Sequence, residues 1–316
     1  MSYVTRRQVC GHRVTKGIWL VLLGKAIINE KNNCMKTLIV ATDFSAIARN
    51  ATQYAMEMAR AIEASVHLLH VYQLPANYGM LDIPISMPDW EQGTEDLMDG
   101  LKKQLEQDNG GQVSVSTEVR MGDFVLELTT VCDRLQPYAV IMGCKGSTAV
   151  ERVFLGTHAI QAMKHLVWPV ITVPLEAKFN VIRKIGLACD LAEPEMTVPL
   201  DSIIRLVTDF KATLHVINTH NEQSYDPQLV SASGWLGAKL KDVQHKFHFI
   251  KGDTEAAILH FAQSNNMDLL IVLPRQHSFW DTLIYKSHTK QFVLKSHIPL
   301  MALHFQGETA HHGIKA

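Results

Sequence analysis

An internal repeat constrains this sequence more than any other feature, because a repeated pattern of this length requires two copies of one folded unit. Four short segments recur in the same order along the chain. The matched pairs are 37–43 with 184–190, 69–72 with 214–217, 122–123 with 252–253, and 168–169 with 298–299. The repeat predicts two domains, 35–175 and 181–305, with a linker near 176–180.

Within each copy, apolar runs alternate with amphipathic segments. In the first copy the expected strands are 36–42, 66–71, 113–119, 139–142 and 169–173, and the expected helices cover 48–62, 90–107, 124–135 and 157–165. Uninterrupted apolar strands are typical of a sheet that is covered on both faces. The alternation therefore predicts an α/β fold with a parallel sheet between layers of helices.

The first copy is longer than the second by about 17 residues between its second and third strands. Pro75, Pro84 and Pro88 lie in this region, which predicts a long loop. Residues 1–34 have no counterpart in the repeat and are interpreted as a non-native start or a disordered extension. A signal peptide is the alternative for this segment. The polar tail 306–316 is expected to be frayed.

Charge and cysteine content exclude several classes of protein. Thirty basic residues balance thirty-one acidic ones, and the formal net charge is −1. The absence of a basic stripe argues against a dedicated nucleic-acid-binding protein. Five cysteines without a Cys-x-x-Cys pair indicate a reducing compartment rather than a disulfide framework or a zinc ribbon. We expect a cytoplasmic protein with neither nucleic-acid nor membrane partners.

A glycine constellation follows the fourth expected strand of the first copy. Gly143 and Gly146 come directly after the strand, and Gly156 precedes Thr157 at the start of a helix. Glycine lets a backbone approach a ligand closely, and the N–H groups of a helix start attract anions. The pattern is consistent with a phosphate cradle. The alternative is that the glycines only turn the chain and that Thr157 is an ordinary N-cap.

The common phosphate-binding motifs are absent from the sequence. There is neither a Gly-x-Gly-x-x-Gly after the first strand nor a Gly-Lys-Ser/Thr. A triphosphate would then be neutralised by a divalent cation, with help from Lys145 or Arg152. Such a site is better suited to holding a nucleotide than to splitting it rapidly.

The spacing Gly-x2-Gly-x9-Gly-Ser/Thr, together with Asp43 after the first strand, resembles the universal stress protein family. The resemblance covers both copies. It implies two tandem adenine-nucleotide alpha-hydrolase-like domains, each with a five-stranded, mostly parallel sheet in the order 3-2-1-4-5. It further implies that the copies pack as an intramolecular pseudo-dimer, and a homodimer remains open.

The same resemblance implies a site for ATP, with Mg²⁺, in the first copy. Asp43 and the backbone of Val71 would contact adenine, while the glycine loop would hold the phosphates. The implied set is Ala41, Thr42, Asp43, Val71, Met142, Gly143, Lys145, Gly146, Gly156, Thr157 and His158. Neither catalytic residues nor metal-ligating side chains are assigned.

The second copy departs from the glycine pattern. Leu273, Gln276 and Lys286 stand where the three glycines are expected, and only Ser287 and Asp190 remain compatible. Bulky side chains at these positions should block the close approach of phosphates. We therefore expect the second copy not to bind ATP, although Arg275 and Lys286 could attract another anion.

Two further groups of residues were considered for chemistry. His245 and His248 are three apart in an expected strand and should point to opposite faces, so joint metal ligation with His215 or His220 is not expected. Cys144 is either a redox-sensitive thiol with a pKa lowered by a helix dipole or a small residue tolerated in a turn.

Three functions remain open at this level. The first is an ATP-binding stress-response protein with one competent site. The second is a nucleotide-free interaction module, and the third is a slow ATP hydrolase, which the missing P-loop lysine and catalytic base disfavour.

Overall fold

Both halves of the chain begin with a strand whose side chains are buried on both faces. In the computed structural model, Leu38, Ile39 and Val40 of β1 (Lys36–Ala41) are fully buried, and β6 (Lys184–Ala188) opens the second half. The structure describes residues 35–73, 87–144, 157–191, 193–219, 227–252, 254–274 and 298–305. The expected extension 1–34 and tail 306–316 lie outside these residues.

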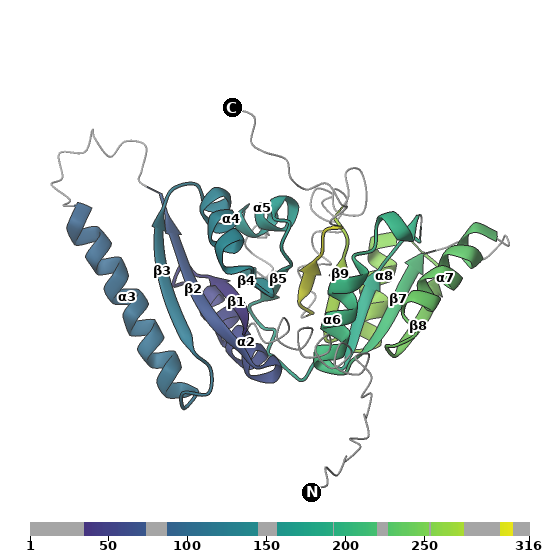
Figure 1. The fold of residues 1–316 in the computed structure, drawn as a ribbon, viewed down its shortest axis with the longest axis horizontal. Coiled ribbons are helices and arrows are strands. Elements are labelled where there is room, and N and C mark those ends of the chain that lie inside the picture. The colour runs from purple at the N-terminus through teal and green to yellow at the C-terminus, as the bar shows by residue number, and fades with distance from the viewer. Residues whose placement is uncertain are drawn as a thin grey trace, which may run out of the picture. The chain divides into compact units, whose positions relative to one another are not determined.

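Strands and helices alternate throughout the described chain (Figure 1). The first half continues with α2 (Ala46–Ile62), β2 (Ala64–Tyr72), α3 (Met87–Asp108), β3 (Val115–Met121), α4 (Phe124–Leu135), β4 (Ala139–Cys144), α5 (Thr157–His165) and β5 (Val170–Pro174). The second half continues with η2 (Pro194–Met196), α6 (Leu200–Phe210), β7 (Thr213–Thr219), α7 (Pro227–Lys239), β8 (His245–Ile250), α8 (Thr254–Ser264), β9 (Leu269–Val272) and β10 (Leu300–Ala302).

The ten strands form one sheet in the order β3-β2-β1-β4-β5-β10-β9-β6-β7-β8. Within each half the order is third, second, first, fourth, fifth, and neighbouring strands run parallel. The halves meet where β5 pairs with β10 antiparallel, with Ile171 opposite Met301. The expected α/β fold class and strand order are confirmed.

The strand register corrects one part of the repeat alignment. Ile39 of β1 lies opposite His67, and the matching Gly186 of β6 lies opposite His215. His215 is therefore the counterpart of His67, not of His70, whose place in the second half is taken by Asn218. The match of 69–72 with 214–217 was wrong because the two His-Val dipeptides fall at different positions along their strands.

The extra residues of the first half are partly helical rather than a long loop. Helix α3 begins at Met87 and has 22 residues, whereas its counterpart α7 has 13. Pro88 lies in the first turn of α3, where its missing N–H leaves no intrahelical hydrogen bond unmade. Pro75 and Pro84 lie outside the described residues. The expected helix 90–107 was therefore placed too late.

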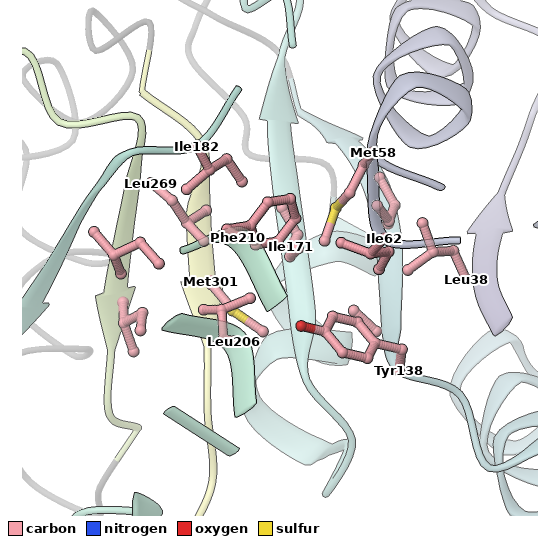
Figure 2. Close-up of a cluster of buried hydrophobic side chains, with 14 of the residues drawn as sticks. Leu38, Met58, Ile62, Tyr138, Ile171, Ile182, Leu206, Phe210, Leu269 and Met301 are labelled. Atoms are coloured by element: carbon pink, nitrogen blue, oxygen red, sulfur yellow. The ribbon is translucent and has the colours of Figure 1, made fainter. Parts of the chain in front are cut away.

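Two apolar clusters lie on the two faces of the sheet. One contains residues of α2, α3, α6 and α7, and the other contains residues of α4, α5 and α8. The first cluster includes side chains of both halves, and Figure 2 shows part of it, with Ile62, Ile171 and Phe210. Burial of this continuous apolar surface stabilises the two halves together.

Polar contacts accompany the β5–β10 pairing. Lys36 Nζ donates to Asp209 Oδ1 at 2.6 Å, which links the start of β1 to α6. His304, which follows β10, donates from Nε2 to the Met163 carbonyl of α5 at 2.9 Å. Burial lowers the pKa of His304, the hydrogen bond to Met163 raises it, and nearby His165 lowers it, with a net value below the ordinary 6.5.

Acidification should therefore destabilise the protein partly through His304. The unfolded chain binds a proton at this side chain more readily than the folded chain does, so stability is lost as the pH falls below about 6.5. His304→Gln can still donate to Met163 but cannot titrate. We expect the variant to lose less unfolding free energy than the wild type between about pH 7.5 and pH 5.5, measured by urea denaturation. An equal loss in both proteins would contradict this role.

Candidate functional site

The carboxyl ends of three neighbouring strands form the centre of the candidate site. Ala41, at the end of β1, pairs with Leu69 of β2 on one side and with Met142 of β4 on the other. The side chains of Ala41 and Met142 are buried in the cluster that contains α4 and α5. Only the main chain of these two predicted site residues is available to a ligand at this edge.

The loop after β1 has a defined geometry. The Phe44 N–H donates to Thr42 Oγ1 at 3.1 Å, and Phe44 adopts a left-handed conformation with φ of 62°. Ser45 caps α2 by accepting a hydrogen bond from the Ala48 N–H at 3.1 Å. This turn leaves Asp43 exposed at the edge of the sheet.

Asp43 is held as a carboxylate. Its Oδ1 accepts a hydrogen bond from the Ser45 N–H at 3.0 Å. Partial burial would raise the pKa of Asp43, but hydrogen bonds from the Ser45 side chain and backbone outweigh it, so the pKa lies below 3.8. At neutral pH the side chain is an acceptor for a ligand N–H group.

His70 is a residue of this edge that the sequence reasoning missed. Its Nδ1 lies 2.7 Å from the Thr42 carbonyl and, facing an acceptor, donates to it. The imidazole ring lies 4.8 Å from the Phe44 ring and 6.3 Å from the Tyr72 ring. The neighbouring Val71 is half-buried against the α4 side of the sheet. The sequence feature that could have identified His70 as a site residue is its position near the end of the second strand.

Gly143 lies inside β4, which is longer than the expected strand 139–142. A Cβ atom at this position would be 2.7 Å from Ile47 Cγ2 and 2.8 Å from the Ile47 carbonyl oxygen of α2. Packing of α2 against β4 therefore requires glycine here, independently of any ligand.

Cys144 points into the protein and is not a reactive thiol. It is the last residue of β4, it is buried, and burial raises the pKa of its thiol to about 12 although the Thr172 hydroxyl opposes the shift. The hypothesis of a thiol activated by a helix dipole was wrong, because desolvation of the thiolate dominates.

The rest of the predicted phosphate cradle is described only at its ends. Lys145, Gly146, Arg152 and Gly156 lie outside the described residues. Thr157 begins α5, and the next residue, His158, is exposed with its ring 4.5 Å from that of Phe124. The structure thus brings the ends of β1, β2 and β4 together, and the cradle residues between 145 and 156 stay a prediction.

The equivalent edge of the second half keeps the loop geometry of the first. Leu191 adopts φ of 58°, and its N–H donates to Cys189 Sγ at 3.4 Å, as Phe44 does to Thr42. The Asn218 amide donates to the Cys189 carbonyl at 2.9 Å, in the place of His70. Asp190 is exposed like Asp43. Arg275, Gln276, Lys286 and Ser287 lie outside the described residues.

Comparisons with known proteins cover both halves. The model of the universal stress protein family matches residues 35–174 and again residues 182–304. The chain belongs to the universal stress protein family. The resemblance inferred from the glycine spacing and Asp43 is thereby confirmed.

Individual relatives agree with this assignment. A universal stress protein of Synechocystis is 23% identical over 289 residues, covering 84% of this chain and 99% of the relative. A universal stress protein of Methanocaldococcus jannaschii is 26% identical over 152 residues, covering 47% of this chain and 87% of the relative. The crystal structure of one from Archaeoglobus fulgidus has a TM-score of 0.65 at 15% identity, covering 85% of this chain and 98% of that one, which supports the fold.

This universal stress protein was expected to have no membrane partner. Among the helices that the structure describes, none is both long enough and apolar enough to cross a bilayer.

The packing role of Gly143 predicts a loss of stability that needs no nucleotide. Gly143→Ala should lower the unfolding free energy by about 1–3 kcal/mol, because its Cβ overlaps the backbone of α2. Gly100→Ala is a matched control, since Gly100 is exposed within α3 and has nothing within 4 Å of a Cβ. The control should gain about 0.5–1 kcal/mol. The measurement is urea denaturation. An unfolding free energy of Gly143→Ala equal to that of the wild type would contradict the packing explanation.

Proposed function

We propose that this universal stress protein binds ATP, together with Mg²⁺, in its first half and not in its second. The observation that carries the proposal is the convergence of Asp43, Thr42 and His70 at the carboxyl edge of β1 and β2. Parallel α/β sheets bind ligands at this edge. Binding rather than rapid hydrolysis is proposed, because the sequence has no P-loop lysine and no residue that its motifs identify as a catalytic base.

The described residues suit the base of the nucleotide. The Asp43 carboxylate can accept a hydrogen bond from an exocyclic amine such as that of adenine, and its low pKa keeps it ionised at neutral pH. The main chain at Val71 offers further hydrogen-bonding groups beside it. The His70 and Tyr72 rings supply aromatic surface for a planar ligand.

The phosphates would be held between the end of β4 and the start of α5. The helix that begins at Thr157 has first-turn N–H groups without intrahelical partners, and such groups favour an anion. Lys145, Gly146 and Gly156 would complete the cradle, as the family motif implies. Mg²⁺ would be held mainly by the phosphates, since the described residues contain no group of three potential metal ligands.

The two halves differ on the phosphate side rather than on the base side. Leu191 and Asn218 reproduce the contacts of Phe44 and His70, whereas Leu273 and Lys286 replace glycines of the motif. Leu273 is partly buried against the apolar cluster that contains α6 and α7. Loss of the small residues is the reason for proposing a single ATP site.

A nucleotide-free interaction module is the second candidate. It is favoured by Gly143, because the contact with Ile47 already requires glycine at this position without any ligand. Under this reading, the first glycine of the motif reflects packing, and ATP does not bind to either half.

Titration calorimetry with Mg²⁺-ATP separates these possibilities. We expect a stoichiometry near one per chain. A value near two would contradict the loss of the second site, and the absence of heat at millimolar ATP would support the interaction module.

Exchange of one residue between the halves tests the phosphate cradle. Gly156→Lys should weaken ATP binding at least about tenfold, because a side chain would displace hydrogen bonds to a charged phosphate that contribute about 1.5–3 kcal/mol each. Lys286→Gly is the matched control and should leave binding unchanged, since Leu273 and Gln276 remain. Circular dichroism and thermal unfolding confirm that both variants are folded. Wild-type affinity in a folded Gly156→Lys protein would show that the cradle is misplaced.

A further inference from the structure

Two histidines of the second half form a close pair that lies apart from the nucleotide site. Nδ1 of His215 in β7 is 2.9 Å from Nε2 of His248 in β8. The two ring planes are inclined by 8°, and the ring centroids are 5.0 Å apart. Both side chains are half-buried. The sequence analysis considered these histidines and did not expect joint metal ligation. Its expectation that His245 and His248 point to opposite faces agrees with their separate ring contacts. His220 lies outside the described residues.

The geometry brings two ring nitrogens face to face. Two nearly parallel imidazole planes with nitrogens 2.9 Å apart correspond to an N–H···N hydrogen bond, in which one ring donates and the other accepts. Phe261 of α8 lies 4.8 Å from the His248 ring and restricts its orientation. Two neutral imidazoles held in this way are a preorganised pair of nitrogen ligands.

The first half has a different arrangement at the same place. There His67 contacts the Ser116 hydroxyl at 2.8 Å and Glu118 at 3.1 Å, and Glu118 also contacts Arg120 and Arg134. The repeat places His248 at the position of Glu118. Ile250 and Ser264 stand at the positions of the two arginines. An ion-pair network has thus been replaced by two imidazoles without the arginines.

We propose that His215 and His248 bind a borderline transition-metal ion, with Zn²⁺ as the reference ion. Zn–N bonds of about 2.0–2.1 Å in a tetrahedral site place two nitrogens about 3.3 Å apart. The observed separation therefore has to widen by about 0.4 Å, and each ring has to rotate so that its nitrogen points at the ion instead of at the other ring. The proton that lies between the rings moves to another ring nitrogen by tautomerisation, so the imidazoles stay neutral.

The donor atoms select the class of metal. Imidazole binds a metal ion through a neutral ring nitrogen. Imidazole nitrogens suit borderline transition-metal ions such as Zn²⁺, whereas Mg²⁺ and Ca²⁺ prefer oxygen ligands.

The described part of the chain contributes two ligands to this ion. It holds no cluster of three or more His, Cys, Asp or Glu side chains suited to a metal. Water would occupy the remaining positions, so the site is open and its affinity is lower than that of a closed four-ligand zinc site. An open site of this kind can exchange its ion.

Zinc titration of the full chain tests the proposal. We expect His215→Gln and His248→Gln each to weaken the tightest Zn²⁺ binding event at least about tenfold in calorimetry, and the double variant to be no weaker than either single one. His245→Gln, on the same strand, is the matched control and should bind Zn²⁺ like the wild type. MgCl2 should give no heat at this site. Wild-type Zn²⁺ affinity in both single variants would overturn the proposal.

A measurement on the unaltered protein covers the case in which the variants do not fold. In nitrogen-15 spectra of the imidazole rings, substoichiometric Zn²⁺ should shift the His215 and His248 signals before those of the other histidines. Earlier shifts at other histidines would show that the tightest zinc site lies elsewhere, and would overturn the assignment.

Discussion

The antiparallel pairing of β5 with β10 joins the two repeats into a single sheet. Three residue pairs carry it, with Ile171 opposite Met301 at the centre. Because the strands on either side are buried on both faces, the pairing also brings together the apolar residues of α2 and α6 in one cluster. The junction also holds the neighbouring strands in place. The carboxyl edge of each half is formed by the ends of these strands.

The duplication has preserved main-chain geometry while its side chains have diverged. Phe44 and Leu191 share a left-handed backbone, and His70 and Asn218 donate to equivalent carbonyl groups. The phosphate side of the motif and the His67–Glu118 network were altered instead. This division is physically reasonable, because a strand-to-helix turn is fixed by local hydrogen bonds, whereas side chains at a ligand edge can change without disturbing the core.

Sequence reasoning recovered the fold because the repeat and the buried strands are strong signals. It was less successful with helix boundaries and side-chain partners. Helix α3 begins before the expected position because Pro88 is tolerated in a first turn. The pairing of His215 with His248 depends on the register of β7 and β8, which brings together residues 33 apart in the chain. A dipeptide match alone placed His215 in the wrong register.

By itself, the sequence determined the duplication, the alternation of strands and helices, and the glycine motif that distinguishes the two halves, because these properties follow from local spacing and from apolar periodicity. The family resemblance carried by that motif implied the strand order. Only the tertiary structure decided that Gly143 is required by Ile47, that Cys144 is buried and that His70 joins Asp43 at one edge. Each of these depends on which elements pack together, and packing is set by the whole chain rather than by the residues adjacent in sequence.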